Sequence, residues 1–174
     1  MKRRISLLLT AFFAVLAMSL GATASESPVR VKAAFLYKFC SYVEWPETSF
    51  AEDDSPLIIG VIGSDRMEAD LSEITRNRLV GKHPISIKRI VSLTEIPGLH
   101  VLFLGEINPE QGVGFEISTK PILVVTDESG LPPYSTINFV TQNHRIRFEV
   151  SRSNALKSGL KISSQLLAVA SRVM

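Results

Sequence analysis

The stretch from Val31 to Pro46, VKAAFLYKFCSYVEWP, constrains the fold more than any other window beyond the N-terminal leader, because it concentrates apolar and aromatic side chains. At helical spacing Leu36, Phe39 and Val43 form one stripe, which predicts a largely buried helix. Pro46 is expected to end this helix, since the residue before a proline is pushed out of the helical conformation. Such an apolar helix needs cover on two sides, so we expect a sheet against one flank and a second helix or a partner against the other.

The first 24 residues have the three-part pattern of a secretory signal peptide. Basic residues at positions 2–4 precede an apolar run at 5–20 and the small residues Ala-Thr-Ala at 22–24. An uncleaved anchor is the alternative, but the run is shorter than the ~20 residues that a spanning helix needs. We therefore expect residues 1–24 to be removed and residues 25–174 to form one domain in an exported compartment.

The charge balance changes when this leader is removed. The leader holds three of the 19 basic residues and none of the 17 acidic ones, so the mature net charge is 16 minus 17, or −1. Binding to nucleic acid needs a clustered positive field, which such a chain does not offer. The charge of the mature chain therefore argues against nucleic acid as a partner.

Apolar runs separated by turn residues predict an α/β domain with a mostly parallel sheet. Asp65 and Glu68 have the spacing of a capping box, which predicts a helix from Arg66 to Thr75. A half-exposed edge strand is expected because apolar and polar residues alternate after Pro84. The expected elements are buried strands at 57–62, 99–104 and 121–126, the edge strand at 85–91, a helical turn at 93–96 and a short helix within 105–114.

The pattern changes after Asp127, where two runs at 137–140 and 145–150 predict an antiparallel hairpin. A short helix at 151–158 should end at Gly159. Ser163 or Ser164 should cap a last helix whose apolar face comprises Leu166, Leu167, Ala170 and Val173. The sequence thus predicts a single compact α/β domain whose central, mostly parallel sheet ends in an antiparallel hairpin, with helices on both faces.

No catalytic, cofactor-binding or metal site is predicted. The histidines His83, His100 and His144 are scattered and there is one cysteine, so the spacing of a metal site is missing. A Gly-x-Ser-x-Gly elbow is absent as well. Cys40, within the apolar stretch, is expected to be buried and inert rather than to form an intermolecular bridge.

Two blocks of sequence, VKAAFLYKFCSYVEWP and INFVTQNHRIRFEVSRSNALKSGLKISSQLLAVA, resemble the YfiR-like family of periplasmic regulators. GKHPISIKRI, LHVLFLG and PILVVTDESG lie between them in the order of the family. The resemblance implies a periplasmic α/β domain, often dimeric, that represses an inner-membrane diguanylate cyclase by binding its periplasmic region. It also implies an OmpA-type outer-membrane lipoprotein as a second partner, which sequesters the repressor.

The resemblance also implies a partner-binding surface at the end of the first helix and at the turn before the last one. Ser41, Glu44 and Ser163 occupy these positions. The chain departs from the family in two respects. The best-known members have several disulfide-bonded cysteines where this chain has one, and Ser135-Thr136 stands where the family has a glycine pair.

The predicted function is a non-enzymatic periplasmic regulator that binds other proteins and lowers cyclic di-GMP signalling. One alternative is a small-molecule-binding protein with a pocket among Phe39, Tyr42 and Trp45, which would require a cavity of ~300 Å³ or more. A hydrolase is the other, and it would require a histidine hydrogen-bonded to a serine or a carboxylate in a cleft.

Overall fold

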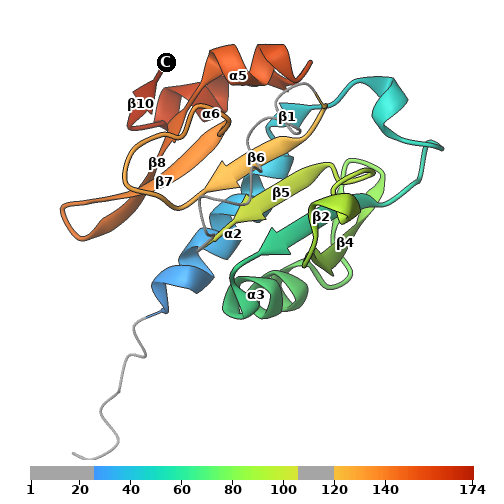
Figure 1. Ribbon diagram of the computed structural model, residues 1–174, viewed down its shortest axis with the longest axis horizontal. Coiled ribbons are helices and arrows are strands. Elements are labelled where there is room, and N and C mark those ends of the chain that lie inside the picture. The colour runs from blue at the N-terminus through green and yellow to red at the C-terminus, as the bar shows by residue number, and fades with distance from the viewer. Residues whose placement is uncertain (1–25, 106–119) are drawn as a thin grey trace, which may run out of the picture.

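The computed structural model describes residues 26–105 and 120–174 (Figure 1). The predicted signal peptide lies outside these residues, as does nearly all of the short helix predicted at 105–114. None of the helices in the described part of the chain has the length and apolarity that crossing a bilayer requires.

The described residues form one α/β domain around an eight-stranded sheet of order β10-β8-β7-β6-β5-β2-β4-β3. Neighbouring strands from β4 through β2, β5 and β6 to β7 are parallel, whereas β7–β8 and β3–β4 are antiparallel. This confirms the predicted α/β class and its mostly parallel sheet. The strands are β2 (Leu57–Ile62), β3 (Leu79–Val80), β4 (His83–Arg89), β5 (Val101–Leu104), β6 (Leu123–Thr126), β7 (Ile137–Gln142), β8 (Arg145–Val150) and β10 (Arg172–Val173).

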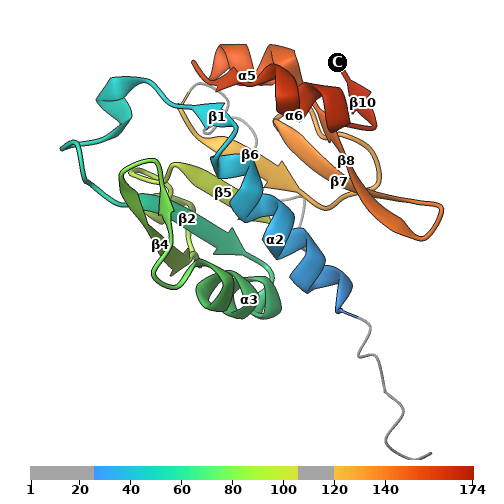
Figure 2. The ribbon, with the colours of Figure 1, turned by 180° about the vertical axis from the view of Figure 1, so that it is seen from behind.

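Four α-helices and a small second sheet complete the described part of the chain. The helices are α2 (Pro28–Cys40), α3 (Asp65–Thr75), α5 (Arg152–Lys157) and α6 (Ser164–Val169), and two 3-10 helices are η1 (Glu47–Ser49) and η2 (Leu93–Glu95). The second sheet is a two-stranded ribbon of β1 (Val43–Glu44) and β9 (Lys161–Ile162). Figure 2 shows α2 lying across one face of the main sheet with α3 beside it.

Helix α2 is the expected central helix, but the prediction that it continues to Pro46 is wrong. The helix begins at Pro28, where the missing N–H and fixed φ of proline suit the first turn. It ends at Cys40, where the N–H of Ser41 donates to the carbonyl of Lys38 and the N–H of Tyr42 donates to that of Phe39. Val43 then pairs with a distant strand, so its burial reflects sheet packing and not a helical stripe.

The main core lies between α2 and the sheet and is rich in aromatic rings. Phe39, which is 1% exposed, has its ring centroid 4.8 Å from that of Phe148 and 5.7 Å from that of Phe139. Phe35 adds a third neighbour on the same helix face, 6.0 Å from Phe148. Strands β7 and β8 thus receive the apolar side of α2, while α3 covers another flank of the helix, as expected.

The opposite face of the sheet has a second, aliphatic core. Leu102, Leu104 and Val124 from the strands pack with Ile96 and Leu99 from the segment around η2. Gly60 of β2 is required here, because a Cβ at this position would lie 2.5 Å from the side chain of Leu99. The chain after η2 can therefore pack directly on the sheet.

Local signals predicted several elements and missed some of their ends. Strand β2 has the predicted bounds, and the β7–β8 hairpin turns at Asn143-His144, both with positive φ, as a two-residue turn requires. The cap of α3 is Ser64 and not Asp65, since its hydroxyl accepts from the N–H of Met67. The last helix is shorter than predicted.

Two further differences concern the edges of the sheet. Helix α6 ends at Val169, and Val173 belongs to β10, which pairs with β8, so the prediction that it lies on the helix face is wrong. The predicted edge strand β4 is second from the edge, because β3 pairs with its first residues His83 and Pro84. Both differences come from pairings that no local pattern shows.

Candidate interaction site

The β1–β9 ribbon brings together the three residues that the sequence analysis placed on a partner-binding surface. Glu44 lies opposite Lys161, and the N–H of Ser163 donates to the carbonyl of Tyr42 at 2.9 Å. Ser41 caps α2 immediately before this point. Segments more than a hundred residues apart in the chain thus form one small surface, which we call the ribbon surface (Ser41, Tyr42, Glu44, Lys161 and Ser163).

Most of the ribbon surface is open to solvent. Ser41, Glu44 and Lys161 are exposed, and Tyr42 is 36% exposed. Ser163 is half-buried, and its hydroxyl accepts from the N–H of Leu166 as the N-cap of α6. The serine therefore has a local structural role, while the acid, the lysine and the tyrosine present charge and an aromatic ring outward.

An apolar groove of about 200 Å³ lies beside the ribbon, between α5, α6 and β9. Leu160, Ile162 and Leu167 line it, and Leu156 stands at its rim with 71% of its surface exposed. Val169 of α6 is 61% exposed as well. Leu156 is therefore an exposed apolar side chain at the rim of a groove that adjoins the charged and aromatic groups of the ribbon surface.

A family model described as YfiR/HmsC-like matches residues 29–171. The chain belongs to the YfiR/HmsC-like family. The matched range begins in α2, ends next to β10 and contains the whole ribbon surface, so the resemblance noted in two sequence blocks extends through the domain. A search of curated proteins found no match.

In this YfiR/HmsC-like domain the three aromatic residues proposed as a ligand pocket have three different environments. Phe39 is packed in the main core against Phe139 and Phe148. Tyr42 is on the surface, and the indole N–H of Trp45 donates to the carbonyl of His100 at 3.0 Å. These contacts do not favour a shared aromatic cavity.

Two of the histidines that are scattered in the sequence come together around Phe50. The ring centroid of Phe50 lies 3.8 Å from that of His83 and 4.3 Å from that of His100. His83 Nδ1 contacts the carbonyl of Ser55, and His100 Nε2 donates to that of Ser49 while its Nδ1 accepts from the N–H of Ile58. Burial lowers the pKa of His100. These bonds to the backbone fix the loop before β2 rather than prepare a catalytic base.

No group of three metal-ligating side chains occurs among residues 26–105 and 120–174. Cys40 is 1% exposed, and its thiol donates to the carbonyl of Leu36 at 3.4 Å. Burial raises the pKa of the Cys40 thiol to about 12. The predicted burial of Cys40 is confirmed, and its environment opposes formation of the reactive thiolate.

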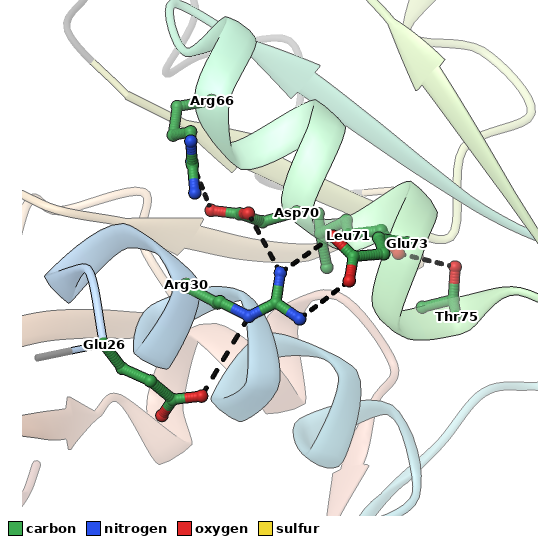
Figure 3. Close-up of polar contacts among 7 residues, drawn as sticks. All are labelled: Glu26, Arg30, Arg66, Asp70, Leu71, Glu73 and Thr75. Carbon is green, nitrogen blue, oxygen red and sulfur yellow. Dashed lines mark hydrogen bonds and ion pairs between the residues drawn. The ribbon is translucent and has the colours of Figure 1, made fainter. Parts of the chain in front are cut away.

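A cluster of charges joins α2 to α3, and the sequence analysis missed it (Figure 3). Arg30 donates to both oxygens of Glu73 at 2.9 Å and to Asp70 at 3.4 Å. Asp70 is 3% exposed and also accepts from Arg66 at 2.8 Å. The hydrogen bonds to Glu73 and the negative charge of Glu73 raise the pKa of Arg30. Arg30 is forty or more positions from its partners on α3, so no sequence spacing could have predicted the contact.

The segment at Ser135-Thr136, where the sequence analysis expected a departure from the family, is held by buried polar contacts. Ser135 is fully buried, and its hydroxyl donates to the carbonyl of Ile137 at 2.8 Å. The side chain of Asn138 donates to the carbonyls of Glu128 and Gly130, which fixes the loop between β6 and β7. Ser135 therefore acts inside the fold rather than at a surface.

Proposed function

We propose that this protein is a non-enzymatic periplasmic regulator that represses an inner-membrane diguanylate cyclase by binding the periplasmic region of that enzyme. Membership of the YfiR/HmsC-like family over residues 29–171 carries the proposal. Repression of the cyclase lowers cyclic di-GMP and, with it, surface attachment. The proposal includes export by a signal peptide at residues 1–24 and its removal from the domain at 25–174.

The ribbon surface is the proposed contact with the cyclase. Glu44 and Tyr42 supply a charge and an aromatic ring, which are the groups that give interfaces orientation and energy. The neighbouring groove, with Leu156 at its rim, offers apolar area that the partner would bury. Ser41 and Ser163 lie near Tyr42, at the end of the ribbon away from Glu44 and Lys161, and they complete the proposed contact set.

Family membership also supports proposing a second partner and a second assembly. An OmpA-type outer-membrane lipoprotein would sequester the repressor and relieve the block on the cyclase. A homodimer is proposed as well. Mass measurements on mixtures of the purified proteins would distinguish both assemblies from the complex with the cyclase, because each complex has a different mass.

The regulatory role is tested by deleting the gene and measuring cyclic di-GMP and surface attachment. Both should rise in the deletion strain and return to their original levels when the exported form is restored. A form lacking residues 1–24 should not restore them, because it stays on the wrong side of the membrane from the proposed contact. Unchanged cyclic di-GMP in the deletion strain would refute the regulatory function.

The location of the contact is tested by charge reversal at Glu44. Glu44→Arg should weaken repression while changing stability by less than ~0.5 kcal/mol, because the side chain is exposed. Asp54→Arg is the matched control, since this exposed acid follows Asp53, which pairs with Lys82 at the β3–β4 turn. Full repression by the Glu44 variant would refute the placement of the contact and leave the regulatory role intact.

Ser163 allows a second test that preserves the helix cap. Aspartate is as good an N-cap as serine, so Ser163→Asp should keep α6 folded while adding a negative charge to the ribbon surface. Weaker repression with an unchanged unfolding midpoint would support the contact. Equal loss of repression and stability would show that Ser163 acts only as the cap seen in the structure.

A further inference from the structure

The outer edge of β4 is open over its second half (Figure 1). Strand β3 pairs only with His83 and Pro84, whereas β2 pairs with β4 from Ile85 to Arg89 on the other side. Among the described residues, no strand continues β3 along this edge. The strand therefore has an unpaired side next to its last residues.

The direction of the open backbone groups follows from the pairing with β2. The N–H of Ile90 donates to the carbonyl of Val61, and alternate residues of a strand direct these groups to opposite edges. Ser86 and Lys88 therefore face β2, and Ile87 and Arg89 direct their N–H and C=O groups outward. An extended chain can hydrogen-bond to such a row as an added strand.

A groove of about 540 Å³ runs beside this edge, between β4, β3 and the C-terminal end of α3. The strands contribute apolar side chains to its lining: Ile85 and Ile87 are half-buried, and Leu79 is 56% exposed. Ser72, Thr75 and Asn77 add polar groups from the side of α3. A strand added to β4 would place alternate side chains next to the apolar residues. The edge thus combines main-chain pairing with a surface that selects apolar side chains.

The charge of the groove indicates which chain would dock there. Arg76 and Arg78 line it, and the described lining contains no acidic residue. Lys88 is exposed on the same strand, while Arg89 is already paired with Asp65 at 2.7 Å. A second copy docked edge to edge would bring the two arginine rims together, so a partner of opposite charge fits better.

We propose that the β4 edge docks an extended segment of another protein, with acidic side chains alternating with apolar ones, as an added β-strand. The apolar side chains of the segment contact Leu79, Ile85 and Ile87, and its carboxylates face Arg76 and Arg78. This site is separate from the ribbon surface, which lies beside α5 and α6 near the other end of the sheet. It therefore does not depend on the proposed repression of a cyclase.

The first test uses a fluorescent peptide of alternating glutamate and valine, about eight residues long, which is enough to pair along the open edge. Its fluorescence anisotropy should rise saturably with the full domain, and added salt should weaken binding because exposed charges are screened. A lysine–valine peptide of the same length should bind at least about tenfold more weakly. No saturable binding, or equal binding of both peptides, would overturn the proposal.

Amide exchange measured by NMR tests the strand pairing directly. The N–H groups of Ile87 and Arg89 should exchange rapidly in the free domain and slow about tenfold or more when the peptide is saturating. Those of Ser86 and Lys88 should change little, because β2 already pairs with them. Binding that leaves the exchange of Ile87 and Arg89 unaltered would overturn strand addition.

Two variants locate the site. Ile87→Pro removes the outward N–H without removing a bond to β2 and should abolish peptide binding. If that variant fails to fold, Arg76→Glu provides the test: it should no longer bind the glutamate–valine peptide and should bind the lysine–valine peptide instead. Arg147→Glu, an equal charge change at an exposed position of β8, is the matched control and should bind as the original protein does. Retained glutamate-peptide binding by Arg76→Glu would overturn the proposal.

Discussion

The two ends of α2 are fixed by opposite kinds of interaction. Near its start, Arg30 is joined to Glu73 and Asp70 of α3 by charged hydrogen bonds, and 31% of its side chain is exposed. Near its end, Phe39 is 1% exposed and packs on two rings of the sheet. Charged contacts in water contribute little and respond to salt and pH, whereas a buried ring contributes several kcal/mol and responds to neither.

This difference matters for the ribbon surface, which starts directly after the helix. Ser41 and Tyr42 follow the end of α2 that is set in the core, so the candidate contact is held by apolar packing. The charged end lies a full helix length away. Changes at Arg30 should therefore affect the stability of the domain and leave the ribbon surface in place.

The largest expected effect concerns the thiol beside Phe39. A thiol reagent should label Cys40 roughly 10³ times or more slowly in the native protein than in the unfolded one, because labelling requires unfolding. Its raised pKa, about 12, suppresses the thiolate further. Moving the thiol one position outward, as Cys40→Ala with Ser41→Cys, should give rapid labelling. Fast native labelling of the original protein, or a covalent dimer on a non-reducing gel, would contradict the burial.

Truncation of the ring itself should produce the largest loss of stability. Phe39→Ala should lower the free energy of unfolding by about 3–5 kcal/mol, because it leaves a cavity between α2 and the sheet. Tyr42→Ala is the matched control: its ring is 36% exposed, so the loss should be much smaller. Urea titrations measure both variants. An unchanged midpoint for Phe39→Ala would show that α2 is not the centre of the core.

The charged end should give a smaller effect. Asp70→Asn keeps the size of a side chain that is 4% exposed but removes the charge shared with Arg30 and Arg66. Because both arginines can remain hydrated, the expected loss is about 1 kcal/mol, and it should shrink as salt is added. Glu26→Gln, at an exposed acid 4.0 Å from Arg30, should change nothing measurable. A loss as large as that of Phe39→Ala would remove the contrast between the two ends.

The smallest expected effect depends on pH. Hydrogen bonding to Arg30 and the charge of that residue lower the pKa of Glu73. A carboxyl group with a lowered folded pKa stabilises the protein above its unfolded pKa, which is ~4.3, and this contribution disappears as the pH falls through the folded value. The difference between the original protein and Glu73→Gln should therefore vanish in acid. Unfolding midpoints measured across this range test it, and a difference that widens on acidification would contradict it.

The sequence predicted the elements whose signals are local. The apolar run at 57–62 is β2, the turn at Asn143-His144 joins two strands, and Ser151 and Gly159 bracket α5. Each depends on conformational preferences within a few residues, which remain valid whatever the chain meets later. The family was also accessible from residue patterns. The assignment of Ser41, Glu44 and Ser163 to a partner-binding surface stays a prediction.

Tertiary structure decided the features that depend on distant partners. The chain leaves its helix at Cys40 because Val43 pairs with Ile162, and Val173 leaves the last helix to pair with Val150. Segments far apart in sequence also form three other features. These are the contacts of Arg30 with α3, the stacking of Phe50 with two histidines, and the open edge of β4. Periodicity reports which side chains are apolar or charged, whereas strand pairing and burial, which depend on the whole chain, decide where each of them lies.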